Sequence, residues 1–274
     1  MTRFLLALAL LATPAMAHDR VVAIGGSVTE IIAALGAENR LVGRDSTSTY
    51  PETILTLPDV GYIRALAPEG VLSLAPTLIL AEPDAGPPAT VDVLKAAGVE
   101  FDTMPGDPTP QGVIAKITAV AQALNLPAEG KALADKVQSG LTEAETRAAG
   151  VATPKRVLFL LSLQGGQVMA GGEGSSADAI IRLSGGINAV TGFKGYKPMT
   201  DEAVIAAAPD AILMMDREGK MSMTPADVLA HPAIAQTPAA ASQSVIAMDG
   251  MLLLGFGPRT PDAAQALYTA LYGG

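Results

Sequence analysis

The sequence predicts an α/β protein with two similar lobes joined by one long rigid helix, with a ligand cleft between the lobes. Three observations support this prediction. Apolar strand-like runs alternate with helical segments, a charged stretch rich in Ala, Glu and Lys divides the chain near its middle, and the pattern is similar on both sides of that stretch. Strands that alternate with helices also favour parallel sheets built from crossover units.

The first 17 residues, MTRFLLALALLATPAMA, have the pattern of an export signal. They contain one early cation, a short apolar run and the small-residue end Ala15-Met16-Ala17, which is typical of a cleaved signal peptide. A permanent membrane helix requires about 20 apolar residues, and this run is shorter. We therefore expect cleavage near Ala17 and a mature protein outside the inner membrane.

The composition indicates a folded, acidic chain. Hydrophobic residues make up 49% and charged residues 16%, which is not the balance of a disordered protein. The chain has no cysteine, so its fold must be held by its core alone. A net charge of −9 argues against nucleic acid and anionic membranes as partners.

The first lobe is predicted to span residues 18–126. The run RVVAIGG (20–26) predicts a strand and a glycine turn, and SVTEIIAALGA predicts a helix with Ser27 at the cap position and Glu30 three residues on, as in a capping box. The same alternation recurs in TLILAE followed by PPATVDVLKAAG, and in VEFDTMPG followed by TPQGVIAKITAVAQALN.

Residues 127–150 predict the helix that joins the lobes. The stretch PAEGKALADKVQSGLTEAETRAAG has no proline after its first residue and consists mostly of good helix formers. A helix of about 20 residues reaches about 30 Å, which is enough to cross between lobes. The second lobe, residues 151–274, then restarts the pattern with the strand-like run TPKRVLFLLS.

The two lobes also contain related segments. Residues 62–80 read YIRALAPEGVLSLAPTLIL, and residues 196–214 read YKPMTDEAVIAAAPDAILM. Each begins with tyrosine, and in each a proline follows a glutamate, Glu69 or Glu202, by seven positions. Two similar lobes, one connecting helix and an export signal together indicate a solute-binding protein with its ligand between the lobes.

Four stretches of the chain carry a more specific resemblance, and they are GGSVTEIIAALGAENRLVGRDSTSTYP, PDVGYIRALAPEGVLSLAPTLIL, GYKPMTDEAVIAAAPDAILMM and MLLLGFGPRTPDA. Together they resemble the periplasmic haem-binding proteins of bacterial ABC haem importers, over essentially the whole mature chain. Cobalamin-binding and ferric-siderophore-binding proteins share the two-lobe plan and the glutamate-containing repeats but not the GYIRAL element, so they are the alternative.

The resemblance implies ferric haem b as the transported ligand, with the Tyr62 phenolate as the iron ligand. Ferric iron suits an anionic oxygen, and tyrosine is a known axial ligand of haem. Free tyrosine ionises near pH 10, so a nearby cation would help to favour the phenolate. Residues two apart face the same way in an extended segment, so Arg64 is expected beside Tyr62 as its hydrogen-bond donor.

Some relatives carry a histidine after the strand that opens the second lobe. Here that place reads LLSLQGGQVMAGG, and the only histidines of the chain are His18 and His231. We therefore expect a five-coordinate iron with one protein ligand.

Further contacts to the haem ring or its carboxylates are less specific. Apolar residues at strand ends are commonly core, and cations in loops commonly pair with local acids, so each candidate has a structural alternative. The candidates are Arg44, Tyr50, Met169, Tyr196, Phe256 and Arg259.

Glu69 and Glu202 are each predicted to begin a helix. Such carboxylates complement the helix dipole, which is the structural alternative. The resemblance instead implies docking on arginines of an inner-membrane ABC permease that works with an ATPase, downstream of an outer-membrane haem receptor system. A monomer is expected. An enzyme such as a glycosidase would need two carboxylates about 5 to 9.5 Å apart in one cleft, whereas these two lie on separate lobes, so no enzymatic activity is predicted.

Overall fold

The N-terminal lobe is a parallel sheet with helices on its faces. The computed structural model describes residues 19–216 and 222–273, so the predicted export signal lies outside the described residues. The strand order is β2-β1-β3-β4, with every pairing parallel, as the alternating pattern predicts. The elements are β1 (Val21–Ile24), α1 (Gly26–Ala34), β2 (Leu41–Arg44), α2 (Pro68–Leu72), β3 (Leu78–Ala81), α3 (Pro88–Ala96), β4 (Glu100–Thr103) and α4 (Pro110–Ala123), with 3-10 turns at Glu38–Arg40 and Glu52–Thr56.

The C-terminal lobe is built on a second sheet of order β10-β9-β5-β6-β8, with β7 also paired to β5. Its strands are β5 (Arg156–Ser162), β6 (Val168–Gly171), β7 (Ile187–Asn188), β8 (Tyr196–Met199), β9 (Ala211–Asp216) and β10 (Val245–Asp249). Its helices are α6 (Ser176–Leu183), α7 (Asp201–Ala207), α8 (Pro225–Leu229), α9 (Pro238–Ala241), α10 (Gly250–Leu254) and α11 (Thr260–Tyr272), with 3-10 turns at Gln164–Gly166 and Ile234–Gln236.

This second sheet is mixed, which corrects the expectation of parallel pairing throughout. Strand β6 runs antiparallel to both β5 and β8. Strands β5 and β6 are joined by residues 163–167, which are too few for a crossover helix but enough for a hairpin. Gly165 and Gly166 both have positive φ, at 64° and 77°, and make that turn.

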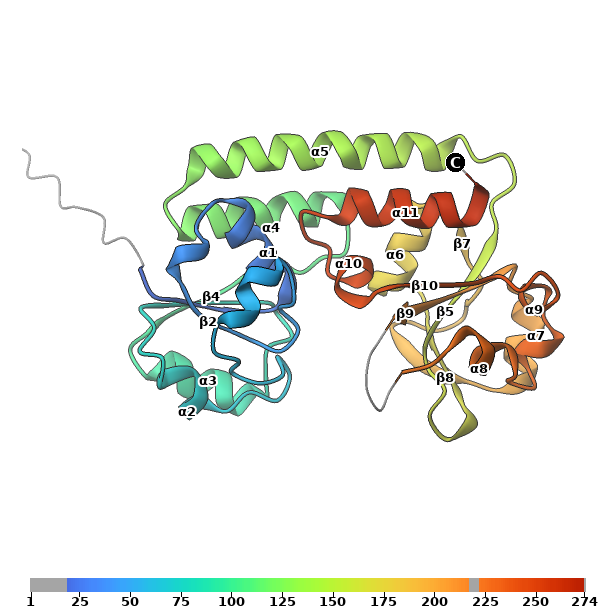
Figure 1. Ribbon diagram of the computed structural model, residues 1–274, viewed down its shortest axis with the longest axis horizontal. Coiled ribbons are helices and arrows are strands. Elements are labelled where there is room, and N and C mark those ends of the chain that lie inside the picture. Colours follow the sequence, from blue (N-terminus) through green and yellow to red (C-terminus); the bar gives the residue numbers. More distant parts are fainter. Residues whose placement is uncertain (1–18, 217–221, 274) are drawn as a thin grey trace, which may run out of the picture.

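Helix α5 (Pro127–Ala149) joins the lobes as predicted. It has 23 residues, and at 1.5 Å per residue it is about 35 Å long. It packs on α4 at one end and on α11 at the other, and Figure 1 shows it lying along one side of both lobes. Among the described residues, no helix combines the length and apolarity needed to cross a membrane.

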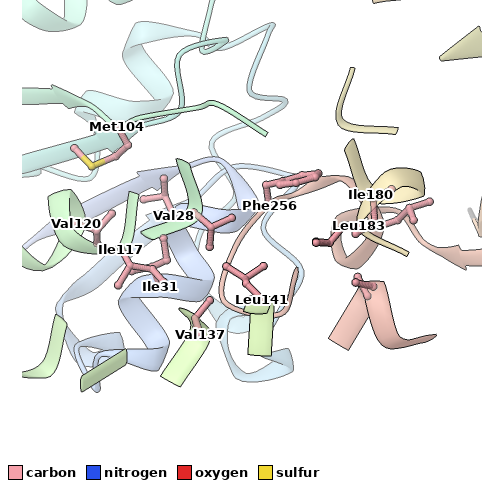
Figure 2. Packing of buried hydrophobic residues seen from close by; sticks show 14 of the residues in the cluster. Val28, Ile31, Met104, Ile117, Val120, Val137, Leu141, Ile180, Leu183 and Phe256 are labelled. Atoms are coloured by element: carbon pink, nitrogen blue, oxygen red, sulfur yellow. The ribbon is translucent and has the colours of Figure 1, made fainter. Parts of the chain in front are cut away.

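The core is continuous across the lobe boundary. One buried cluster includes Val28 and Ile117 of the first lobe, Leu141 of α5, and Ile180 and Phe256 of the second lobe. Figure 2 shows these side chains packed beside one another. Burial of apolar surface therefore stabilises the relative position of the two lobes as well as each lobe by itself.

The start of α1 differs from the predicted capping box. The helix begins at Gly26, its cap residue is Gly25, and no side chain caps it. The Ser27 hydroxyl instead donates to Glu82, and Glu30 pairs with Arg259 of the other lobe. These side chains have partners distant in sequence, so the capping interaction predicted from local spacing is absent.

Candidate functional site

A cleft of about 1020 Å³ lies between the lobes. This volume is at the upper end of the range for small-molecule sites, about 300–1,000 Å³. Several wall residues lie at or just after the carboxyl ends of β2, β3, β5, β9 and β10, the edge where open α/β sheets bind ligands. The walls include 46–47, 49, 62–64, 82–84, Gly106, Pro108 and Lys116 from the first lobe, and 161–162, Met169, Ser176, Tyr196, Met215, 249–251 and 254–256 from the second.

Tyr62 lies in a tight turn at this edge. Gly61 has a φ of 97°, which an L side chain rarely adopts, and its amide donates to the Asp59 carboxylate at 2.8 Å. The Ala65 amide donates to the Tyr62 carbonyl at 2.7 Å and closes the turn. Within this turn the Ile63 side chain is buried and anchors the backbone. Tyr62 keeps 45% of its surface exposed and lines the cleft.

The predicted contact between Tyr62 and Arg64 is present. Arg64 Nη1 donates to Tyr62 Oη at 2.5 Å. The local geometry differs from the expectation, however, because this segment is a turn and not an extended strand. The arginine reaches the phenol because its side chain is long, with its Cζ 5.7 Å from the ring centroid.

Asp84 is a site residue that was missed at the sequence level. Its Oδ2 accepts from Arg64 Nη2, so the same guanidinium holds Tyr62 and Asp84. Asp84 is the third residue after strand β3, in Glu82-Pro83-Asp84. A polar residue at that position was the available signal, because the ends of parallel strands form the ligand edge.

Three other predicted residues also line the cleft, all from the second lobe. They are Met169 of β6, Tyr196 at the start of β8, and Phe256 after α10. The Tyr196 ring meets Phe159 edge to face, with the ring centroids 6.1 Å apart. Burial raises the pKa of Tyr196, which favours its neutral phenol.

Arg44, Tyr50 and Arg259 are not among the residues that line the cleft. Arg44 Nη1 donates to the Asp59 carboxylate at 3.2 Å and to the Asp45 carbonyl at 3.1 Å, behind the Tyr62 turn. The Arg259 guanidinium pairs with Glu30 and lies 3.8 Å above the Tyr50 ring centroid. All three therefore have structural partners in the protein itself.

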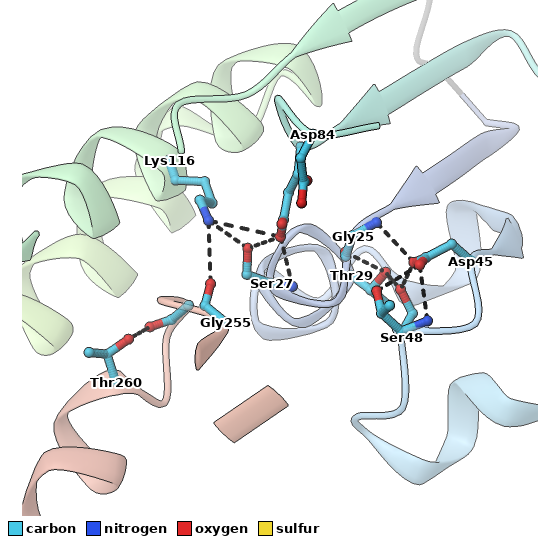
Figure 3. Close-up of polar contacts among 12 residues, drawn as sticks. Gly25, Ser27, Thr29, Asp45, Ser48, Asp84, Lys116, Gly255 and Thr260 are labelled. Atoms are coloured by element: carbon cyan, nitrogen blue, oxygen red, sulfur yellow. Dashed lines mark hydrogen bonds and ion pairs between the residues drawn. The ribbon is translucent and has the colours of Figure 1, made fainter. Parts of the chain in front are cut away.

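A buried polar cluster forms part of the cleft floor and was not predicted. The Lys116 ammonium donates to Ser27 Oγ at 2.7 Å and lies 3.9 Å from the Glu82 carboxylate. It also reaches the Gly255 carbonyl of the other lobe at 3.5 Å, as Figure 3 shows. Burial raises the pKa of Glu82 and lowers that of Lys116. A lone lysine among Val113, Ile117 and Val120 on the apolar face of α4 was the sequence signal.

Comparison with known proteins places this fold and cleft in a family. The family model described as periplasmic binding protein matches residues 21–252. The chain belongs to the periplasmic binding protein family. Members of this family are periplasmic solute-binding proteins.

Several solved structures are similar to this periplasmic binding protein over most of its length. The periplasmic haem-binding protein BhuT in complex with two haems is 43% identical, with a TM-score of 0.87, and the match covers 92% of this chain and 97% of that one. The haem-binding protein RhuT from Roseiflexus sp. RS-1 is 39% identical, with a TM-score of 0.89 and coverage of 93% and 98%. HutB of Vibrio cholerae is 35% identical, with a TM-score of 0.81 and coverage of 93% and 99%.

Curated relatives are more distant. The vitamin B12-binding protein of Yersinia pestis is 27% identical, over 79% of this chain and 76% of the relative. An uncharacterised ABC transporter substrate-binding lipoprotein of Bacillus subtilis is 26% identical over 72% of this chain, and the matched part spans 63% of that lipoprotein.

The glutamates of the two repeats lie in equivalent places in this periplasmic binding protein. Glu69 is in the first turn of α2 and Glu202 in the first turn of α7, and both side chains are exposed. Each helix leads to a buried strand, β3 or β9. A backbone hydrogen bond, followed by one from the Thr200 hydroxyl, lowers the pKa of Glu202, so its carboxylate is charged at neutral pH.

His231 does not contribute to the cleft walls. It is buried in the second lobe, where its Nε2 lies 3.0 Å from the Gly166 carbonyl oxygen. Within the described ranges, no group of three or more His, Cys, Asp or Glu side chains is arranged to hold a metal ion. Two exposed oxygen-bearing side chains of the cleft, Tyr62 and Asp84, share the cation Arg64, and Tyr62 is the phenol of the two.

Proposed function

We propose that this protein captures ferric haem in the interlobe cleft and delivers it to an inner-membrane ABC permease with its ATPase. The observation that supports this most directly is the exposed Tyr62 phenol, which lines a large cleft and accepts a hydrogen bond from Arg64. Similarity to haem-binding proteins over more than nine-tenths of the chain supports the same ligand class.

In this proposal Tyr62 supplies the single protein bond to iron. An anionic phenolate oxygen suits ferric iron, and the adjacent guanidinium stabilises that negative charge. Ile63, Met169 and Phe256 provide apolar contact for the porphyrin. Lys116 is already paired on the cleft floor, so Arg64 is the exposed cation among the cleft residues of the described chain.

Cobalamin is the alternative ligand, because vitamin B12-binding proteins match over 79% of the chain. Haem is favoured because the haem-binding structures are more similar in sequence, at 43% and 39% identity. A purified sample titrated separately with hemin and with cyanocobalamin distinguishes the two. Saturable binding of cyanocobalamin without hemin binding would replace this proposal by the alternative.

The decisive variant is Tyr62→Phe, which keeps the ring and removes the oxygen. We expect the tyrosinate-to-iron charge-transfer band and the high-spin ferric spectrum to disappear, while far-UV circular dichroism is unchanged. Tyr196→Phe is the matched control, because Tyr196 also lines the cleft but its hydroxyl is hydrogen-bonded by Ser175 and the Ala177 backbone, and Arg64 acts on it only through its charge. A wild-type ferric spectrum from Tyr62→Phe would show that another residue binds the iron.

We also propose that Glu69 and Glu202 dock on arginines of the permease. Their equivalent positions on two lobes provide two separated contacts, and rim charges of this kind mainly orient and speed association. Changing both to Lys should leave haem affinity unchanged and stop uptake through the cognate permease. Normal uptake by the double variant would rule out this docking role.

Export and assembly complete the proposal. Cleavage after Ala17 would leave His18 as the mature N-terminus, which N-terminal sequencing of periplasmic material can check. The mature protein would act as a monomer, downstream of an outer-membrane haem receptor system. Light scattering that gives the mass of a dimer would contradict the monomer.

A further inference from the structure

The guanidinium of Arg64 makes two hydrogen bonds in different directions. Its Nη1 donates to Tyr62 Oη at 2.5 Å, and its Nη2 donates to Asp84 Oδ2. Arg64 is 57% exposed and Asp84 is 40% exposed. A long, exposed arginine has many rotamers, so a second fixed partner decides how often its guanidinium faces the phenol.

Asp84 is such a fixed partner, because its loop is joined to the Tyr62 turn by backbone hydrogen bonds. The Gly86 amide donates to the Ile63 carbonyl at 2.9 Å, and the Leu66 amide donates to the Gly86 carbonyl at 2.9 Å. At the other end of the loop, the Glu82 amide donates to the Ile24 carbonyl at 2.9 Å. The carboxylate of Asp84 is therefore presented from a backbone that is tied to the turn it serves.

We propose that Asp84 is a positioning residue that holds the Arg64 guanidinium against Tyr62 Oη. This inference rests on the proposed role of Tyr62 in haem binding. The planar fork of arginine is required, since one terminal nitrogen serves the phenol while the other serves the carboxylate. The cleft thereby presents its iron-binding oxygen with a hydrogen-bond donor already in place.

In the alternative, Asp84 acts only through its negative charge. Its effect on haem binding would then be the opposite of that expected for a positioning residue. A carboxylate near a phenolate disfavours the phenolate, and it also offsets part of the charge of Arg64. If this charge effect dominates, removing Asp84 strengthens haem binding. If positioning dominates, removing Asp84 weakens binding, because Arg64 leaves the phenol oxygen.

The first test measures haem affinity of Asp84→Ala, Arg64→Ala and the double variant. Partners in the outer shell of a metal ligand typically contribute 10- to 100-fold in affinity, and the exposure of this pair points to the lower end, about 10-fold for Asp84→Ala. In the Arg64→Ala background, Asp84→Ala should cause no further loss. Asp135→Ala is the matched control, because Asp135 also pairs with an exposed cation, Lys131, but on α5 away from the cleft.

Two conservative variants refine this test. Asp84→Glu keeps the carboxylate and should recover much of the affinity lost by Asp84→Ala. Arg64→Lys keeps the charge but has a single nitrogen, so it should bind haem nearly as weakly as Arg64→Ala. An unchanged or tighter complex with Asp84→Ala, or losses that multiply in the double variant, would overturn the positioning role.

The second readout is spectroscopic. A hydrogen bond withdraws electron density from the phenolate oxygen, so its loss moves the phenolate-to-iron charge-transfer band to longer wavelength. Asp84→Ala should move this band in the same direction as Arg64→Ala, by a smaller amount. A shift to shorter wavelength would identify Asp84 as a simple charge.

The third readout uses the ligand-free protein and does not depend on haem. Nitrogen-15 NMR of the arginine side chains should show slow rotation of the Arg64 guanidinium in the wild type and fast rotation in Asp84→Ala, with Arg64→Ala used to assign the signal. Fast rotation in the wild type would overturn the positioning claim. Failure of the wild type to bind haem would instead overturn the proposed function and leave this measurement to decide the role of Asp84.

Discussion

Arg259→Ala should destabilise the folded protein strongly, because Arg259 connects the two lobes. Its Nε donates to Glu30 Oε2 at 3.0 Å, and its Nη2 donates to Glu30 Oε1. The Glu30 side chain is only 6% exposed and that of Arg259 is 21% exposed. The guanidinium also stacks on Tyr50 of the first lobe, 3.8 Å from its ring centroid.

The magnitude follows from what the substitution leaves behind. Removing one partner of a buried ion pair costs about 3–5 kcal/mol, because the other charge stays buried without compensation. The partial exposure of Arg259 places this pair at the lower end of that range, and the lost stacking on Tyr50 adds about 0.5–1 kcal/mol. We expect a loss of about 3–4 kcal/mol in the free energy of unfolding.

Urea denaturation followed by circular dichroism at neutral pH measures this loss. Lys131→Ala is the control, since Lys131 pairs with Asp135 on one helix and the two side chains are 75% and 66% exposed. Its loss should be about 0.5 kcal/mol or less, as for exposed pairs within one helix. Adding Glu30→Gln to Arg259→Ala should recover part of the stability, because it removes the unpaired charge.

The reasoning would be refuted if Arg259→Ala cost no more than Lys131→Ala. Additive effects of Glu30→Gln and Arg259→Ala on the free energy of unfolding would also refute it, because residues that form one ion pair are expected to be coupled.

Three further predictions concern the lobe boundary and the connecting helix. Gly26→Ala should cost about 1–3 kcal/mol in urea denaturation, because its Cβ would lie 2.4 Å from Met251 Cε and 2.8 Å from the Thr47 carbonyl oxygen; wild-type stability would contradict this packing. Burial raises the pKa of Glu30 above its ordinary 4.5, so the folded state keeps a proton that the unfolded chain has lost. The stability of the wild type relative to Glu30→Gln should therefore be greatest below about pH 4.5 and fall as the pH rises through the folded pKa of Glu30. A stability difference that instead increases with pH would show that the pKa of Glu30 is lowered in the folded protein. X-ray scattering curves with and without haem should nearly superimpose, because α5 resists bending and packs on both lobes; a large compaction would show a hinge instead.

A sequence motif predicted one contact in the cleft correctly but not the backbone conformation that produces it. Tyr62 and Arg64 were assigned from the resemblance carried by the GYIRAL element, and their contact is present in the structure. The predicted reason for this contact was wrong, because the segment is a turn and not an extended strand. Residues two positions apart are close in either backbone conformation, so the predicted contact holds although the predicted conformation does not.

The sequence by itself determined the elements and their order. Alternating apolar runs, the strand ends and the proline-free stretch of α5 are local patterns, and local backbone preferences follow from them. The two lobes, the central strands of both repeats and the connecting helix were therefore predictable. The direction of β6 was not predicted, although the short glycine-containing connection after β5 indicates a hairpin.

Only the tertiary structure decided which polar groups became partners. Glu30 and Arg259 are 229 positions apart, and Lys116 and Ser27 are 89 apart. The acidic residues of the chain number 27 and the basic residues 18, so sequence spacing cannot select one pair among so many. Burial at the lobe boundary makes that choice, because a charge removed from water is tolerated only where the fold brings a compensating group to it.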